Sequence, residues 1–423
     1  MSSHTTIRPI FSTLLWLACS LSGVSSRPQA LRPTFEHVQT RANSKFILGA
    51  IGDSWGSGVS WSEDTQYDDN MSRCMRYKYA WSTVVNSNYS QWTPDTGKES
   101  VFEFKACSGA HLEDMMNQMD QLTRPNLVLM EAGGNNADFY PMADACLFQA
   151  NYTKDYGTKY EHDNDPKNRT GECRREIDLV RSRLQGDAME QKVRDTIHAW
   201  RGHKAVVGND ASLFLLGYAR FFGPDLDPAC DKWNFCIPWK MKVQNLVAPM
   251  RADFNELVGS MNTAIRRAVE SFDDDKIQFI DIDPGFEGHR FCEPGHRKRE
   301  QYNWNDEVHI WNQPMKWTTT VINGDDVKTY DPLNGILPPP DIMDKLDDAV
   351  DGVPRQEGEY YILTWRNPKY LELSMEWKIR PRDFYAEGSD AGGSIARTLH
   401  PTETGHRDMG NIVIQHLQRH YGH

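Results

Sequence analysis

Short, continuous apolar runs are the feature of this sequence that most constrains its fold. Residues 46–52 read Phe-Ile-Leu-Gly-Ala-Ile-Gly and end at a turn signal. Similar runs follow at Val101–Ala106, Leu127–Glu131, Ala211–Tyr218 and Lys276–Ile282. A strand that is apolar along its whole length is buried on both faces, as in a parallel sheet covered by helices. The sequence therefore predicts five buried strands.

Helical periodicity lies between and after these runs. Apolar residues recur every three to four positions within Val243–Phe272, and the segment Asp408–His420 has the same period. Strands that alternate with helices favour a doubly wound parallel sheet. We therefore expect an α/β protein with a flavodoxin-like three-layer α/β/α sandwich around a five-stranded parallel sheet.

Two stretches break this alternation and are predicted to be insertions. Residues 141–204 contain two sequons, two cysteines and many charged side chains. Residues 301–385 contain Pro338-Pro339-Pro340 and five of the 13 tryptophans. Three interpretations of the longer insertion stay open: a lid, a wall of a substrate site, or a small subdomain. Tryptophans of this kind are more often core residues than ligand contacts.

The charge balance narrows the classes of partner. The 423 residues carry 59 acidic and 47 basic side chains, a formal net charge of -12, and no basic block. Nucleic acids and anionic membranes attract proteins through a positive surface field. The composition therefore argues against both as partners.

The apolar run Ile10–Val24 predicts a signal peptide at residues 1–26. The run follows Arg8 and leads into Ser25-Ser26, small residues that suit a cleavage site. It is short for a bilayer span, so an N-terminal anchor is the weaker alternative, and no later window is apolar enough to cross a membrane. We expect a secreted, extracellular protein in which residues 27–423 form a single domain with the two insertions.

Cysteine usage fits export. Loss of the signal peptide removes one of the eight cysteines and leaves seven. In an oxidising compartment we expect the disulfides Cys74–Cys107 and Cys146–Cys173, because each pair lies beside a candidate strand. Cys230 would then close with either Cys236 or Cys292. The odd count leaves at least one thiol unpaired or joined to another chain.

Two further sequence features bear on covalent and metal chemistry. Sequons for N-glycosylation occur at Asn70, Asn88, Asn151 and Asn168, and several sequons after a signal peptide fit a secreted glycoprotein. The chain has no C-x2-C pair and no histidine cluster at metal-ligand spacing. A metal site is therefore disfavoured.

Ser54 is the candidate nucleophile. The first strand runs directly into Gly52-Asp53-Ser54-Trp55-Gly56-Ser57-Gly58, and glycines beside a serine at the carboxyl end of a strand allow a tight turn that exposes the hydroxyl where open α/β sheets bind ligands. The block also matches G-x-S-x-G, the elbow of α/β-hydrolases, but several strands precede that elbow and only one precedes Ser54. A structural serine in a common turn is the alternative.

Three further polar blocks accompany the predicted strands and the last helix. Gly109 follows the second strand in Ala-Cys-Ser-Gly-Ala-His, and Asn135 follows the third in Glu-Ala-Gly-Gly-Asn-Asn. Backbone N–H groups and a side-chain amide aimed at one point make an oxyanion hole. His400 lies just before the terminal helix, with Pro401 near the first helical position.

Taken in this order, the four blocks resemble the SGNH, or GDSL-type, hydrolase family, which is named after a serine, a glycine, an asparagine and a histidine. The resemblance implies Ser54 as nucleophile and His400 as general base. It also implies an oxyanion hole made by the Ser54 N–H, the Gly109 N–H and the Asn135 side chain. The resemblance covers residues 46–140, 205–300 and 390–423, and Phe221-Phe222 and Gly288–Cys292 are similar to secreted fungal and actinomycete members.

One position departs from the family's pattern. Members usually carry an aspartate three residues before the histidine, and this chain has Arg397 there. A cation does not accept the imidazole Nδ1–H, and the partner of that group fixes the orientation and tautomer of the base. We therefore expect a Ser–His dyad oriented by a backbone carbonyl near Arg397, with Asp390 as a less favoured substitute acid. A decayed site is the alternative.

Other candidate residues have simpler interpretations. Asp281 and Asp283 resemble the paired carboxylates of a glycosidase, but they end a strand, where capping a turn is the commoner role. Histidines outside the proposed dyad are interpreted as loop, packing or supporting groups, and these are His111, His289, His309 and His406.

Together these residues predict a secreted serine ester hydrolase that forms an acyl-enzyme and requires no metal or organic cofactor. The resemblance implies an ester substrate, either an acylated carbohydrate or a lipid, and leaves the choice between them and the oligomeric state open. Two other interpretations remain. One is a catalytically silent secreted protein that binds carbohydrate or lipid on the same scaffold, and the other is an α/β-hydrolase lipase with its acid on a later strand.

Overall fold

The computed structural model describes most of the chain between residues 45 and 422. The described ranges are 45–59, 66–68, 74–94, 97–148, 172–233, 245–296, 307–311, 318–330, 338–346, 350–351, 355–379 and 398–422. The predicted signal peptide lies outside these ranges. Within them, no helix combines the length and the apolar character that a membrane crossing needs.

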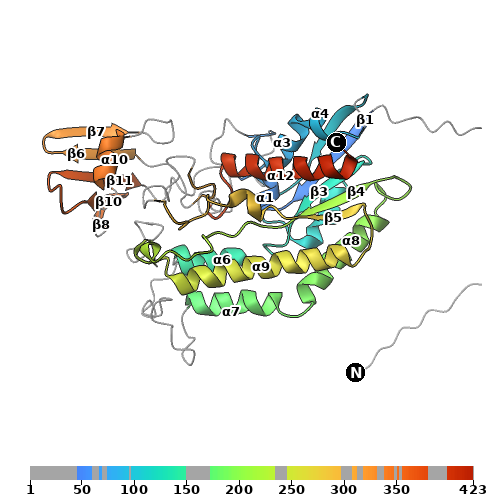
Figure 1. The fold of residues 1–423 in the computed structure, drawn as a ribbon, viewed down its shortest axis with the longest axis horizontal. Coiled ribbons are helices and arrows are strands. Elements are labelled where there is room, and N and C mark those ends of the chain that lie inside the picture. Colours follow the sequence, from blue (N-terminus) through green and yellow to red (C-terminus); the bar gives the residue numbers. More distant parts are fainter. Residues whose placement is uncertain are drawn as a thin grey trace, which may run out of the picture. The chain divides into compact units, whose positions relative to one another are not determined.

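A parallel sheet of five strands, in the order β2-β1-β3-β4-β5, forms the centre of the fold (Figure 1). Every neighbouring pair runs parallel. The strands are β1 (Lys45–Gly52), β2 (Glu99–Phe104), β3 (Leu127–Glu131), β4 (Ser212–Leu216) and β5 (Ile277–Ile280). Every residue of β3 and β4 is buried, as fully apolar strands require. All five predicted strands are confirmed, and their order is the flavodoxin-like one.

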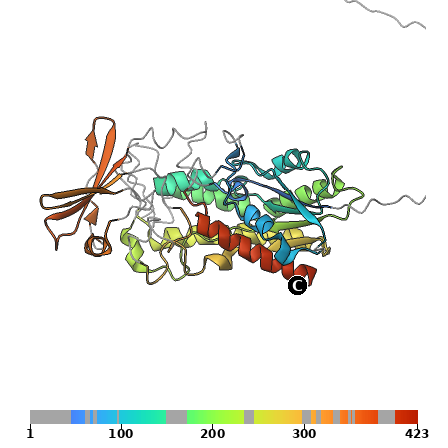
Figure 2. The ribbon, with the colours of Figure 1, turned by 90° about the horizontal axis from the view of Figure 1, so that it is seen from above.

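Helices cover both faces of this sheet. On one face α12 (Glu403–Tyr421) packs along α3 (Trp81–Ser87), and on the other α8 (Ala188–Gly202) packs along α9 (Ala248–Glu270). The view turned by 90° keeps α12 beside the blue helices of the N-terminal half (Figure 2). The predicted three-layer α/β/α sandwich is therefore confirmed.

The long helix α9 shows how apolar spacing produces a buried face. Its buried apolar residues include Met250, Phe254, Leu257, Met261, Ile265 and Val269. The helix starts at Ala248, later than the predicted Val243, because Pro249 has no N–H and fits only the first turn. Helix α12 starts earlier than predicted, because the side chain of Thr402 caps it by accepting a hydrogen bond from the Gly405 N–H.

A second sheet lies within residues 301–385, where the sequence predicted no strands. Its order is β7-β6-β11-β10-β8, β9 also pairs with β10, and every pairing is antiparallel. The strands are β6 (Thr318–Asn323), β7 (Asp326–Tyr330), β8 (Val350–Asp351), β9 (Arg355–Glu357), β10 (Tyr360–Arg366) and β11 (Leu373–Ile379). Trp365 and Trp311 are buried, so these two tryptophans are core residues.

The other predicted insertion, residues 141–204, contains helices that belong to the covering layer. Helix α7 (Glu172–Leu184) and helix α8 both pack against α9. The division of residues 27–423 into one domain with two insertions stays a prediction.

Three disulfides join segments that are distant in sequence. They link Cys74 to Cys107, Cys146 to Cys173, and Cys230 to Cys292. The first two pairings are confirmed, and the third resolves the choice that the sequence left open. Cys236 lies outside the described residues, as do the sequons at Asn70, Asn151 and Asn168, while Asn88 is half-buried at the end of α3.

Candidate active site

Ser54 lies where β1 ends and the chain turns into the short helix α1 (Ser54–Ser57). Two glycines make this turn possible. Gly52 has a φ of 152°, and a side chain there would clash with the carbonyl oxygen of Glu131. Gly58 ends the helix at a φ of 75°, where a side chain would meet Ala80. The hydroxyl of Ser54 therefore lies at the carboxyl edge of the sheet, where open α/β folds bind ligands.

The buried side chain of Asp53 accepts a hydrogen bond from a backbone amide of this turn. Its Oδ1 accepts a hydrogen bond from the Trp55 N–H at 3.0 Å. Among the described residues, no acceptor faces the Ser54 N–H. This amide is consequently left for a ligand oxygen.

His400 meets Ser54 across the site. Its Nε2 lies 2.6 Å from the Ser54 Oγ, although 346 positions separate the two residues. Its Nδ1 lies 3.1 Å from the carbonyl oxygen of Thr398. Since a carbonyl oxygen only accepts, the Nδ1 carries the proton and the Nε2 accepts from the serine hydroxyl. This tautomer is the one that a general base needs.

Main-chain pairing with residues 309–311 holds the His400 loop. The Trp311 N–H donates to the His400 carbonyl at 2.8 Å, and the Leu399 N–H donates to the Trp311 carbonyl at 2.8 Å. Ile310 and Pro401 form an antiparallel bridge beside them. Leu399 has a φ of 65°, a left-handed conformation that costs on the order of 1–3 kcal/mol in a residue other than glycine. The flanking hydrogen bonds hold the loop in this conformation.

Asn135 is the third sequence-predicted group at this edge of the sheet. Its Nδ2 donates one hydrogen to the carbonyl oxygen of Ala110 at 2.9 Å, and the second amide hydrogen remains for a ligand. Gly109, next to Ala110, has a φ of 81°, and no acceptor among the described residues faces its N–H. The Asn135–Ala110 bond thus connects the two loops that carry the predicted oxyanion donors.

A small cavity of about 70 Å³ opens beside Ser54. Ser54, Asn135 and His400 line it, and Gly109 does not. The remainder of the lining is mostly apolar and includes Phe139, Tyr140, Ala143, Phe221, Val258 and Leu399. The site thus combines polar groups at one end with an apolar wall.

The group predicted to orient the imidazole is only partly described. Arg397 and Asp390 both lie outside the described residues. The acceptor that faces the His400 Nδ1 is the carbonyl oxygen of Thr398, one position after Arg397. No side-chain pattern in the sequence singles out this carbonyl, because every residue carries one.

The carboxylate pair considered for a glycosidase is engaged by arginines. Asp281 forms an ion pair with Arg266 at 2.9 Å, and Asp283 forms ion pairs with Arg220 and Arg290 at 2.7 and 3.0 Å. Burial raises the pKa of Asp283, but the hydrogen bonds from Arg220 and the charge of Arg290 more than offset this and leave the pKa below its ordinary value. Such a carboxylate stays ionised and stabilises the fold.

The four other histidines that the sequence analysis considered differ in their surroundings. His406 is fully buried in α12, and burial together with the charge of His400 lowers its pKa to about 3. The rings of His289 and His309 stack with centroids 3.8 Å apart, and His111 stands at the start of a short helical turn. His406 is therefore neutral at ordinary pH.

A buried acidic cluster behind Ser54 was missed by the sequence analysis. Asp53, Glu131 and Tyr218 lie at the ends of β1, β3 and β4, and the Tyr218 hydroxyl donates to the Asp53 Oδ2 at 2.8 Å. Burial raises the pKa of Asp53, and burial followed by the charge of Asp53 raises the pKa of Glu131 well above its ordinary value. The available signal was a polar residue at the carboxyl end of each of these neighbouring strands.

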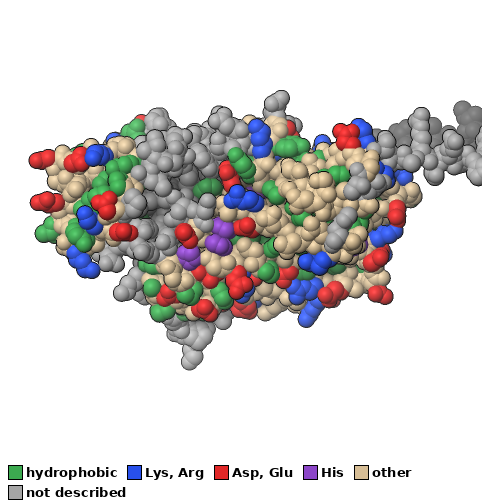
Figure 3. All heavy atoms as spheres, turned by 45° about the horizontal axis from the view of Figure 1, so that its top comes forward, with side chains coloured by type: hydrophobic (Ala, Val, Ile, Leu, Met, Phe, Trp, Pro, Cys, Tyr) green, Lys and Arg blue, Asp and Glu red, His purple; other side chains and the backbone are tan. Residues whose placement is uncertain are grey.

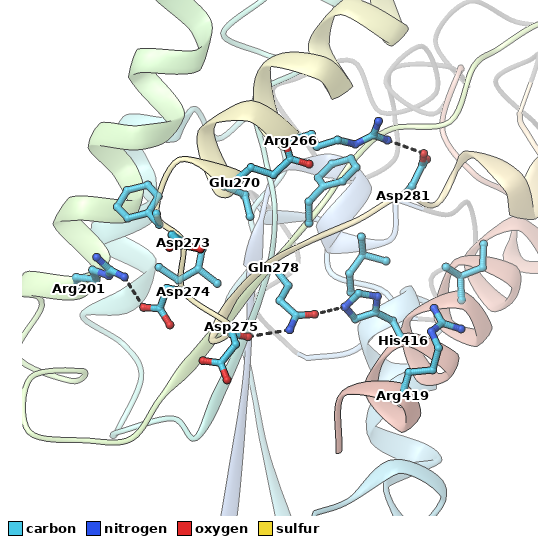
Figure 4. A pocket seen from close by; sticks show the side chains of 16 residues that line it. Arg201, Arg266, Glu270, Asp273, Asp274, Asp275, Gln278, Asp281, His416 and Arg419 are labelled. Atoms are coloured by element: carbon cyan, nitrogen blue, oxygen red, sulfur yellow. Dashed lines mark hydrogen bonds and ion pairs between the residues drawn. The ribbon is translucent and has the colours of Figure 1, made fainter. Parts of the chain in front are cut away.

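A wider hollow, of about 1120 Å³, lies elsewhere, along the edge strand β5 (Figure 4). Two of its arginines are paired with carboxylates: Arg266 bonds to Asp281, and Arg201 bonds to Asp274. Gln278 bridges to His416. Among the described residues that line it there is no serine or cysteine. The smaller cavity at Ser54 is therefore the candidate active site.

Surface charge and metal ligands add no competing site. The face shown in Figure 3 mixes acidic and basic side chains without a field of one sign. Across the described part of the chain, no group of three or more His, Cys, Asp or Glu side chains is placed to hold a metal ion.

Comparisons with known proteins found similarity to solved structures only. No family model and no curated protein matches the sequence. An extracellular lipase from Streptomyces rimosus is similar at 21% identity and a TM-score of 0.43, over 59% of this chain and 85% of that chain. A phospholipase A1 from Streptomyces albidoflavus NA297 gives 22% identity and a TM-score of 0.42, over 59% and 84%. An acetyl xylan esterase from Geobacillus stearothermophilus gives 12% identity and a TM-score of 0.29, over 57% and 80%.

Proposed function

We propose that this chain is an SGNH, or GDSL-type, hydrolase that cleaves carboxylic esters through an acyl-enzyme on Ser54. The observation that carries the proposal is the 2.6 Å contact between the Ser54 Oγ and the His400 Nε2, beside a cavity that Asn135 also lines. A hydroxyl, a base in the correct tautomer and an amide donor at one cavity are the parts that acyl transfer needs.

The reaction follows from these positions. The Ser54 Oγ attacks the ester carbonyl while the His400 Nε2 takes its proton, and the carbonyl oxygen becomes an oxyanion. The Ser54 N–H, the Gly109 N–H and the Asn135 Nδ2 donate to that oxyanion. The imidazolium then protonates the departing alcohol, and a water activated by His400 releases the acyl group from Ser54.

In this scheme a backbone carbonyl orients His400. The carbonyl oxygen of Thr398 accepts its Nδ1–H and holds the tautomer.

The setting of the enzyme is part of the proposal. We expect a secreted, extracellular glycoprotein that loses residues 1–26 and keeps residues 27–423 as one domain with insertions at about 141–204 and 301–385. The three disulfides support an oxidising compartment. The substrate is an ester of a carbohydrate or a lipid, and no metal or organic cofactor takes part.

The size of the cavity limits the length of the acyl chain that it can hold. The cavity of about 70 Å³ is much smaller than the pockets of roughly 300–1,000 Å³ that hold larger ligands, which favours an acetyl or similarly short acyl chain against the apolar wall.

The test is a panel of p-nitrophenyl esters of increasing chain length together with acetylated glycans, run with the wild type and with labelling by an active-serine phosphonate. Turnover of short esters and labelling confined to Ser54 are expected. A wild type that neither turns over any ester nor accepts the label would instead favour a catalytically silent binding protein.

A further inference from the structure

Tyr218 stands directly behind the active-site turn. It lies two residues past the end of β4 and is 5% exposed. Its hydroxyl makes two hydrogen bonds: it donates to the Asp53 Oδ2 at 2.8 Å and accepts from the Gly134 N–H at 2.9 Å. One phenol oxygen thus touches both the residue before Ser54 and the residue before Asn135.

These two bonds belong to a longer chain of contacts. The other oxygen of Asp53 accepts from the Trp55 N–H at 3.0 Å, which sets the turn that presents the Ser54 hydroxyl and N–H. At the other end, the Asn135 Nδ2 donates to the Ala110 carbonyl at 2.9 Å. The three loops that carry the predicted oxyanion donors are therefore joined, and the Tyr218 hydroxyl is the link between the first and the third.

The surroundings of Tyr218 keep its hydroxyl protonated. Burial, and then the neighbouring negative charges of Asp53 and Glu131, raise the pKa of Tyr218 well above its ordinary value. The phenol therefore remains a donor to Asp53 wherever the fold is stable. Its ring packs edge-on against Trp55 with centroids 5.5 Å apart, so rotation of the hydroxyl away from both partners is restricted.

We propose that Tyr218 is a positioning residue whose hydroxyl holds the nucleophile turn and the Asn135 loop at the separation that oxyanion binding requires. The proposal rests on the esterase function proposed above. Electrostatic stabilisation of an oxyanion depends on donors that are fixed before the reaction, because reorganising them during the reaction costs energy. Loss of the hydrogen bonds of the Tyr218 hydroxyl should therefore weaken stabilisation of the transition state more than it weakens substrate binding.

The test compares Tyr218→Phe with Tyr421→Phe, a control in α12 whose ring stacks on Trp92. Removal of the Tyr218 hydroxyl is expected to lower kcat about tenfold, the scale of one lost hydrogen bond of about 1.4 kcal/mol, and to leave KM within a factor of about two. Hydrogen exchange of the peptide that contains the Gly134 amide should become faster. Tyr421→Phe should change neither kcat nor the exchange rate of this peptide.

The outcomes separate this proposal from the proposed function. An active wild type together with a Tyr218→Phe variant that keeps its kcat, or that loses only thermal stability, overturns the positioning role and leaves the esterase intact. An inactive wild type refutes the esterase, and with it a role in catalysis, whatever the variant does. Unchanged exchange at the Gly134 amide overturns the link itself without reference to activity.

Discussion

The nucleophile turn and the histidine loop meet at one contact but are held in different ways. Residues 52–58 are held by buried side chains, with Asp53 and Tyr218 bonded to each other and to backbone amides. Residues 398–402 are held by main-chain hydrogen bonds to residues 309–311. The first arrangement depends on the identity of a few side chains, whereas the second depends mainly on the path of the backbone.

This difference has a physical consequence. Removing a buried polar partner leaves an unsatisfied group, which typically costs 1–3 kcal/mol. A main-chain bond survives most side-chain substitutions, since the donor and acceptor do not change. Substitutions on the nucleophile side should therefore disturb the site more often than substitutions in the histidine loop, apart from His400 itself.

The largest expected effect is loss of either reacting group. Ser54→Ala and His400→Ala should each lower kcat by about 10⁴-fold or more, because the nucleophile and its base act as a unit. Both side chains are only half-buried, so unfolding temperatures should change little. Steady-state rates and thermal melts measure the two quantities. A His400→Ala variant that keeps more than about a tenth of the activity would show that another group serves as base.

Loss of an oxyanion donor comes next. Asn135→Ala should lower kcat by about 10²–10³-fold, the usual loss for one such donor. Asn136→Ala is the matched control, because the Asn136 side chain bonds to Glu113 and Leu112 and does not line the cavity. Rates for both variants on one short ester decide the matter. Equal losses in the two variants would remove Asn135 from the oxyanion hole.

Disulfide removal separates global from local effects. Serine substitution of both Cys74 and Cys107, which are 33 positions apart, should lower the free energy of unfolding by about 3–4 kcal/mol. Substitution of Cys146 and Cys173 should cost a similar amount. Only the first pair adjoins the Gly109 loop, so only that variant should also lose kcat while still folded. Denaturant titrations and rates in dilute buffer test this, and equal kcat values would contradict it.

The last comparison concerns pH, which should change stability rather than rate, and the two sides should respond with opposite sign. The pKa of His406 is lowered to about 3, so between that value and 6.5 the unfolded chain binds a proton that the folded chain does not. The free energy of unfolding should fall as pH drops through this window, by up to about 1.4 kcal/mol per pH unit. His406→Met should flatten the slope. A slope unchanged in this variant would mean that His406 is protonated in the fold.

Glu131, on the nucleophile side, should make the free energy of unfolding fall as pH rises, the opposite of the effect of His406. Its pKa is raised well above 4.5, so above that value the folded chain retains a proton that the unfolded chain has lost. The stability that this proton confers is present below pH 4.5 and disappears as pH rises through the folded pKa. Denaturant unfolding of Glu131→Gln across the pH range should show no such decrease in the free energy of unfolding. An identical pH profile in wild type and variant would place the proton elsewhere.

Local patterns predicted much of this molecule. The run that ends at Gly52 and the serine that follows it lie together in the sequence, so the nucleophile turn was visible there. The strands of the second sheet were not predicted, because segments such as Thr318–Asn323 and Arg355–Glu357 are polar and lack a continuous apolar run. The partner of Cys230 in the third disulfide could not be predicted from the sequence either, because cysteine spacing does not fix connectivity.

The sequence by itself determined the parallel sheet, the covering helices and the chemical identity of the groups at the sheet edge, because burial on both faces imposes an apolar pattern that can be recognised locally. Only the tertiary structure decided that Thr398 offers its carbonyl to His400 and that Tyr218 joins Asp53 to Gly134. The Thr398 contact is local, but it depends on the left-handed backbone of Leu399 between the two residues. The Tyr218 contacts join residues far apart in the chain, and they exist because parallel strands end side by side at one edge.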